Sequence, residues 1–220
     1  MPSRYELELQ QLVDHPDENL ATEIKDWLDL SDRVIRADVA KELIALANHG
    51  GGYLLFGFSE AADGWSPSPS DQVALDHYSQ DSINDILKRH AEPVFECHTA
   101  HITSSAGTLH VVVRVPGGHL VPIRSRGGPE GSRLSDHQYY IRRPGAESAP
   151  PDNAREWDEL IARCVENHHE RQLESFRRII AVMQASPEVM SELSALAAGD
   201  DPLTKWIEQS RERHPGTEPL

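Results

Sequence analysis

A run of three glycines, Gly50-Gly51-Gly52, separates a helical pattern from an almost entirely apolar segment. Before it, Asp32 is a suitable N-cap for a helix that we predict from Arg33 to about Asn48, because the apolar residues there recur at helical spacing. The glycines end this helix, since glycine accepts the left-handed backbone of a helix C-terminus. After them, Tyr53 to Phe58 predicts a central strand that is covered on both faces. This order predicts a helix packed against a sheet.

Short helices and strands are predicted around that unit. The segment Ser104 to Gly107 has the composition of a hairpin turn, and the pattern after Pro150-Pro151 is purely helical. The predicted helices are 5–13, 81–90, 152–183, 186–197 and 204–213, the predicted strands are 20–27, 94–103, 108–115, 120–124 and 138–142, and 61–70 is a predicted loop. We therefore expect an α+β fold: a mixed or antiparallel sheet flanked by helices over residues 1–150, and a helical C-terminal tail over residues 151–220.

The formal net charge of the chain is −15, which argues against nucleic-acid binding as a default. The acidic excess is uneven, however, because the segment from Arg114 to Arg143 holds six arginines against Glu130 and Asp136. It is either a solvated arginine-rich loop or a surface that faces phosphates, and composition does not separate the two. The candidate nucleic-acid contacts are Arg114, Arg124, Arg126, Arg133, Tyr140, Arg142 and Arg143. Strand alternation allows only one residue of the pair Tyr139-Tyr140 to face a ligand.

The N-terminus, the length of the apolar runs and the cysteines suggest the cellular compartment. The N-terminus turns acidic at once, and the longest apolar runs have the length of strands. We expect a cytoplasmic protein without a membrane partner, in which Cys97 and Cys164 are free thiols. Cys97 and His98 do not predict a zinc site, because neighbouring residues of a strand point to opposite faces.

Two carboxylates and a lysine lie close together before the predicted helix. Glu18 and Glu23 are five residues apart, and Lys25 projects from the same strand face as Glu23. A carboxylate beside an ammonium group can hold a metal ion and a phosphate, as metal-assisted phosphodiester cleavage requires. The alternative is a surface ion pair on an edge strand, which contributes little to stability. The glycine run does not predict a phosphate loop, because it follows a helix instead of preceding one.

Four motifs in this order resemble those of the Schlafen-type AlbA-like domain, from about residue 16 to 150. They are Glu23-Ile24-Lys25, Ala45-Leu46-Ala47-Asn48-His49, Gly51-Gly52 with the strand that runs to Gly57-Phe58-Ser59-Glu60, and Tyr139-Tyr140-Ile141-Arg142. The resemblance implies three catalytic and metal-binding acids, which fall on Glu18, Glu23 and Glu60, with Lys25 as a catalytic lysine. Glu60 departs from the family's aspartate, and Asp63 in the following loop is a substitute for it.

The resemblance implies an endoribonuclease that uses Mg or Mn to cleave structured, tRNA-like RNA, with a link to anti-phage defence. It also implies an alternative, because other members bind RNA or DNA without cutting it, and a regulatory interaction module is a third interpretation. The animal ribonucleases of this type carry two such lobes, whereas this chain has room for one. We therefore expect a homodimer, with the helical tail from Asp152 as a contact.

Overall fold

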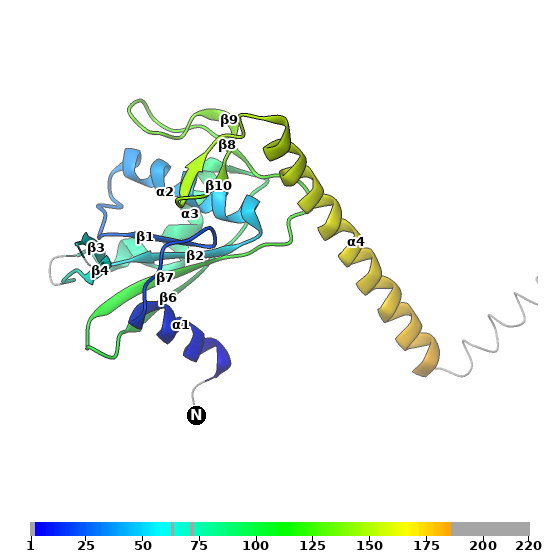
Figure 1. Cartoon of the computed structure of the whole chain (residues 1–220), viewed down its shortest axis with the longest axis horizontal. Coiled ribbons are helices and arrows are strands. Elements are labelled where there is room, and N and C mark those ends of the chain that lie inside the picture. Colours follow the sequence, from blue (N-terminus) through cyan, green and yellow to red (C-terminus); the bar gives the residue numbers. More distant parts are fainter. Residues whose placement is uncertain (1–2, 63, 71–72, 186–220) are drawn as a thin grey trace, which may run out of the picture. The chain divides into compact units, whose positions relative to one another are not determined.

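The computed structural model describes residues 3–62, 64–70 and 73–185 (Figure 1). The chain forms two compact units, Met1–His168 and His169–Leu220. The first unit contains every strand of the described ranges. It also begins the long helix α4 (Ala154–Ala185), whose residues from His169 onward belong to the second unit. The predicted helices at 186–197 and 204–213 lie outside the described residues. None of the helices in the described ranges is long and apolar enough to cross a membrane.

A four-stranded mixed sheet forms the centre of the first unit. Its strand order is β1 (Thr22–Lys25), β2 (Gly52–Phe56), β7 (Leu109–Val115) and β6 (His98–Thr103). β1 pairs with β2 in parallel, while β2, β7 and β6 pair antiparallel. The predicted hairpin turn joins β6 to β7, and Gly107 N–H donates to the Ser104 carbonyl at 2.9 Å. The predicted α+β fold with a mixed sheet is confirmed.

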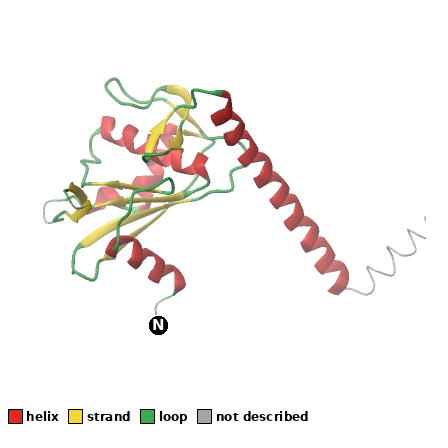
Figure 2. Cartoon of the chain, viewed as in Figure 1, coloured by secondary structure: helices red, strands yellow, loops and turns green. Residues whose placement is uncertain are grey.

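Helices cover both faces of this sheet (Figure 2). α2 (Arg33–His49) and α3 (Gln80–His90) pack on one face, where Leu54 and Phe56 of β2 join the larger core cluster. α1 (Arg4–Asp14) packs on the other face, where Leu55 lies in a second cluster with Leu9. Alternate residues of β2 are thus buried on opposite faces, as the apolar run Tyr53 to Phe58 predicts.

Both ends of α2 follow the prediction. The Asp32 side chain accepts a hydrogen bond from Val34 N–H at 2.7 Å, and Gly50 ends the helix with a left-handed φ of 119°. Gly52 has a second role, because a Cβ atom there would lie 2.1 Å from the Ala21 carbonyl oxygen. The glycine run therefore ends the helix and allows the chain before β1 to approach β2 closely.

The strand prediction for Tyr53 to Phe58 is too long. The chain bends at Gly57, with φ 96°, and continues as β3 (Phe58–Ala61), which pairs antiparallel with β4 (Gly64–Pro67). The predicted loop over 61–70 thus contains a strand. A Cβ atom on Gly57 would lie 2.6 Å from the Trp27 ring, so glycine is required at the bend by a long-range contact that local pattern does not reveal.

Two small sheets complete the first unit, together with the 3₁₀ helix Leu75–Tyr78. β5 (Ala91–Glu92), β8 (Arg124–Arg126) and β9 (Asp136–Tyr139) form one sheet, and β10 (Ile141–Arg143) pairs with β11 (Glu147–Ala149) in the other. The predicted strand 120–124 is displaced toward β8, and the predicted strand 138–142 is divided between β9 and β10. The division falls at Tyr140, because its buried side chain packs in the core while β9 pairs with β8.

Candidate functional site

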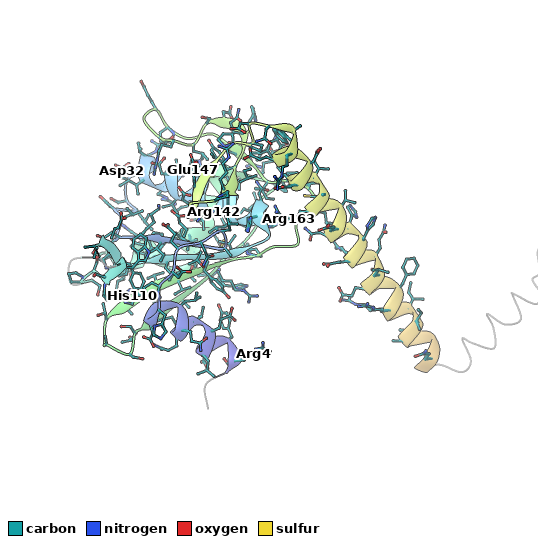
Figure 3. All side chains as sticks on the ribbon, viewed as in Figure 1. Arg4, Asp32, His110, Arg142, Glu147 and Arg163 are labelled. Carbon is teal, nitrogen blue, oxygen red and sulfur yellow. The ribbon has the colours of Figure 1, made fainter. Side chains whose placement is uncertain are left out.

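Glu23 and Lys25 project from β1 toward the face that α2 and β10 cover. Glu23 is 2% exposed, whereas Lys25 is half-buried. One carboxylate oxygen of Glu23 pairs with the Lys25 ammonium group, and the other pairs with Nη1 of Arg142 from β10. Figure 3 labels Arg142. The ion pair predicted from the spacing forms, but it lies in the interior instead of on an exposed strand edge.

Arg142 connects β1 to the β10–β11 hairpin. Its side chain is fully buried, and Nη2 donates to the backbone carbonyls of Asn19 at 2.9 Å and Thr22 at 3.3 Å. Nη1 also donates to the Ser148 hydroxyl at 3.1 Å. A guanidinium with this many acceptors is held in one orientation, because each hydrogen bond fixes the plane of the fork.

A second buried pair lies beside the first. Lys41 and Glu42 of α2 are 3.2 Å apart, and the Lys41 ammonium donates to the Ser148 carbonyl at 3.2 Å. Glu42 Oε2 lies 3.8 Å from Arg142 Nη1. We call these five residues the ion-pair cluster: Glu23, Lys25, Lys41, Glu42 and Arg142. It contains more cationic than anionic groups, so its carboxylates are already neutralised by the protein.

Glu18 lies at the edge of the ion-pair cluster. Its carboxylate accepts a hydrogen bond from Ile24 N–H at 3.4 Å. Burial, and next the nearby Glu23 carboxylate, raise the pKa of Glu18 above its ordinary value, while Lys25 and Arg142 act in the opposite direction. The structure therefore brings Glu18, Glu23 and Lys25 together, as the sequence predicts.

Glu60 does not join them. It is an exposed residue of β3 that lies opposite Trp65 in the β3–β4 hairpin, and it is absent from the charges that act on Glu18. Within the described ranges, no three residues among the histidines, cysteines, aspartates and glutamates form a group that could hold a metal ion. Asp63 lies outside those ranges. Because the oxygens of Glu23 are paired with cations and Glu60 is elsewhere, these residues do not fit Mg or Mn.

Most arginines of the Arg114–Arg143 segment already have acidic partners. Arg124 pairs with Glu92 at 2.7 Å, and Arg133 pairs with Asp38 at 3.0 Å. Arg143 pairs with Asp152 and Glu156, and its guanidinium is the main reason why the pKa of Glu156 falls to about 2. Arg114 is exposed and lies 5.5 Å from the centre of the Tyr5 ring. The solvated, paired interpretation of this segment fits these contacts better than a continuous phosphate-facing surface does.

Two of the candidate nucleic-acid contacts are interior residues. Arg142 is buried in the ion-pair cluster. Tyr140 is 2% exposed, and its hydroxyl donates to the Arg133 carbonyl and accepts from Ser135 N–H. Neither side chain is available to a ligand, so the expectation for these two residues is corrected here. The Arg142 acceptors on Glu23, Asn19 and Thr22 lie about 120 positions earlier, and sequence spacing does not reveal such partners.

A group of arginines that the sequence reasoning missed lines a surface pocket of about 310 Å³. We call it the arginine pocket, and its lining residues are Arg33, Arg36, Arg89, His90, Arg126, Gly127, Gly128 and Pro129. Only Arg126 was a candidate. One sequence pattern could have indicated this pocket. Arg33 and Arg36 lie one turn apart at the start of one predicted helix, and Arg89 lies at the end of another. The sequence does not show that these two helix ends meet.

The chain resembles a known protein family and several solved structures. The profile of the family described as Schlafen, AlbA_2 matches residues 18–150, and no curated protein matches. A crystal structure of a protein from Corynebacterium diphtheriae is similar, with 14% identity and a TM-score of 0.47, over 72% of this chain and 28% of that one. The N-terminal domain of a protein from Nitrosomonas europaea, described as related to the ATP-dependent DNA helicase RecG, has 20% identity and a TM-score of 0.38, over 70% of this chain and 97% of that domain.

Proposed function

Because this chain belongs to the Schlafen AlbA_2 family, we propose that it binds nucleic acid and does not cleave it with a metal centre built from Glu18, Glu23 and Glu60. The family includes nucleases. The observation that carries the proposal is that the Glu23 carboxylate is buried between Lys25 and Arg142, with its oxygens paired to both cations. A divalent metal ion needs such oxygens as ligands, and here it would have to displace a buried guanidinium.

Structured RNA of the tRNA type is the first ligand to test, and DNA is the second. In the assay, the purified protein is incubated with tRNA with and without Mn²⁺, and each sample is divided between a native gel and a denaturing gel. We expect a complex on the native gel that weakens as salt is added, because phosphate contacts release counterions. We expect the same intact RNA in both denaturing lanes. Discrete fragments that require Mn²⁺ would overturn the proposal.

A metal-dependent endoribonuclease is the second candidate, and one observation favours it. Glu18 lies close enough to Glu23 for the two carboxylates to interact, and the pKa of Glu18 is raised by burial first and by this neighbour second. Paired carboxylates are a common element of metal-dependent hydrolases. If the assay yields Mn²⁺-dependent fragments, Glu18→Gln should abolish them, whereas the exposed substitution Arg155→Gln should not.

The expected homodimer also stays a proposal. Described residues of α4 in the second unit carry exposed apolar side chains, and these are Leu173, Phe176, Ile179, Ile180 and Val182. Exposed apolar residues at helical spacing are typical of a helix that pairs with another. A second copy of α4 supplies a complementary apolar face, and such pairing would place two first units in one particle.

A further inference from the structure

The arginine pocket concentrates positive charge on a strongly acidic chain. Arg33 and Arg36 come from the first turns of α2, Arg89 and His90 from the end of α3, and Arg126 from the end of β8. No carboxylate is among the lining residues. The volume of about 310 Å³ is near the lower end of the range for small-molecule sites, so the pocket has room for a phosphate group and part of what carries it.

The arginines that line this pocket have no acidic partner among the described residues. Within the described part of the chain, Arg33, Arg36 and Arg89 form no ion pair, and the side chain of Arg126 donates only to the Lys88 carbonyl, at 3.4 Å. Arg124, Arg133 and Arg143, by contrast, are all paired with acids. Four guanidinium groups around one hollow repel each other, and an anion removes that repulsion.

The pocket wall is held in place by contacts that leave the arginine heads free. His90 Nδ1–H donates to the Gly127 carbonyl at 2.7 Å, and Gly128 N–H donates to the Leu134 carbonyl at 3.0 Å. A Cβ atom on Gly128 would lie 2.8 Å from the Cβ of Ala37, so the loop lies directly against α2. Burial lowers the pKa of His90, and the hydrogen bond to Gly127 opposes this. The Arg89 and Arg36 charges lower the pKa further, which agrees with a positive field here.

We propose that the arginine pocket binds a phosphate monoester, the group carried by the phosphorylated end of a nucleic-acid strand and by a free nucleotide. A monoester carries nearly two negative charges at neutral pH and three oxygens that accept hydrogen bonds. Guanidinium groups bind such oxygens in a bidentate manner. A backbone diester has only one charge and continues on both sides, which suits an extended groove better than a pocket of this volume. Binding of a phosphorylated strand end rests on the proposed function, since it requires that the chain binds nucleic acid. Binding of a free phosphate monoester does not depend on it.

The test uses a short, internally labelled RNA that carries a phosphate at its 5′ end, at its 3′ end or at neither end. Fluorescence anisotropy measures the affinity of the full chain for each, and AMP and inorganic phosphate are added as competitors. One variant is Arg36→Gln with Arg89→Gln. Its matched control is Arg155→Gln with Arg178→Gln, which removes the same charge from exposed arginines that pair with acids on α4.

We expect one phosphorylated RNA to bind about ten-fold more tightly than the RNA without a phosphate. A ten-fold difference in affinity corresponds to about 1.4 kcal/mol, which is close to the lower limit for one hydrogen bond to a charged group. The pocket variant should lose this preference and the control should keep it. Displacement of the RNA by AMP, with similar affinity, identifies the free nucleotide as a ligand, whereas weak displacement identifies the strand end, and either supports the inference.

Two further results separate this inference from the proposed function. If the chain binds all three RNAs equally, or if the pocket variant keeps the preference, the inference is overturned while nucleic-acid binding stands. If the chain binds AMP through the pocket but binds none of the RNAs, phosphate binding stands and the proposed function fails. Circular dichroism of the variants should match that of the parent, since Arg36 and Arg89 make no ion pair in the described structure.

Discussion

Arg142 joins parts of the chain that are distant in sequence. Its guanidinium contacts Glu23 of β1, the carbonyls of Asn19 and Thr22, and Ser148 of β11, and it is fully buried. A buried charge that loses its partner keeps its desolvation cost without the compensating attraction. The cluster is therefore a structural element of this chain first, and any chemistry at Glu23 has to break it.

Replacing Arg142 with alanine should lower the free energy of unfolding by about 3–5 kcal/mol, because Glu23 and Glu42 then lack their buried guanidinium partner. Urea denaturation measures the difference. Arg124→Ala is the matched control, since its pair with Glu92 is about 40% exposed and such pairs contribute about 0–1 kcal/mol. Equal losses for the two variants would contradict a structural role for Arg142.

Glu18 gives a prediction about pH. Its pKa is raised in the folded protein, so its contribution to stability is present below the unfolded pKa and is lost as the pH rises through the folded pKa. Glu18→Gln should therefore raise the melting temperature at pH 7 and leave it nearly unchanged at pH 4. Thermal unfolding at the two pH values tests this, with the exposed substitution Glu60→Gln as the control. A variant that is less stable than the parent at pH 7 would contradict it.

The sequence pattern predicted that Glu23 and Lys25 lie together, but it did not predict which distant residues contact them. The spacing of Glu23 and Lys25 placed both on one strand face, and the structure agrees. It could not show that Arg142 reaches Glu23 from 119 residues further along the chain. The same limit explains the paired arginines, because Asp38, Glu92 and Glu156 approach them only through tertiary structure.

At the level of elements, the junction of α2 with β2 depends on glycine for steric reasons. Gly52→Ala should destabilise the fold, because the new Cβ would lie 2.1 Å from the Ala21 carbonyl oxygen next to β1. Gly107→Ala is the matched control: its φ is 87°, but a Cβ there meets no atom within 4 Å, so only the backbone cost of about 1–2 kcal/mol applies. Chemical denaturation should show a larger loss for Gly52→Ala, and a smaller loss would contradict this view of the junction.

Helix ends and turns were predicted correctly where a few neighbouring residues determine them. The N-cap at Asp32, the glycine end of α2 and the hairpin between β6 and β7 are each encoded within a few residues. The β3–β4 hairpin was missed because 61–70 is rich in turn-forming residues, and pairing of β3 with β4 overrides that composition. The bend at Gly57 was missed because the Trp27 ring, which leaves no room for a side chain there, lies thirty positions earlier.

The exposed face of α4 leads to a prediction about assembly. Phe176→Gln with Ile180→Gln should convert a dimer to a monomer, because it removes apolar surface that is exposed within its unit. Size-exclusion chromatography with light scattering measures the mass at micromolar concentration. Arg171→Gln with Arg177→Gln is the control on the same helix and should stay dimeric. A parent protein that is strictly monomeric would contradict the proposed homodimer.

For the whole molecule, the distribution of charge matters more than its sum. The chain is acidic overall, yet the acids near the arginine-rich segment pair with its members and leave the arginine pocket as an unpaired positive site in the described structure. Net charge alone argues against a nucleic-acid partner, whereas this distribution allows one at a defined place. Nucleic acid should therefore bind at the arginine pocket, with an affinity that falls as salt is added.

Whether the acids hold a metal ion decides between a binding module and a nuclease. Titration of the full chain with Mn²⁺, followed by the electron paramagnetic resonance signal of the free ion, measures this without any RNA. Because Glu23 is paired with Lys25 and Arg142, we predict no saturable Mn²⁺ site in the micromolar to millimolar range. Binding of one Mn²⁺ ion per chain that is lost in both Glu18→Gln and Glu60→Gln would contradict the proposed function.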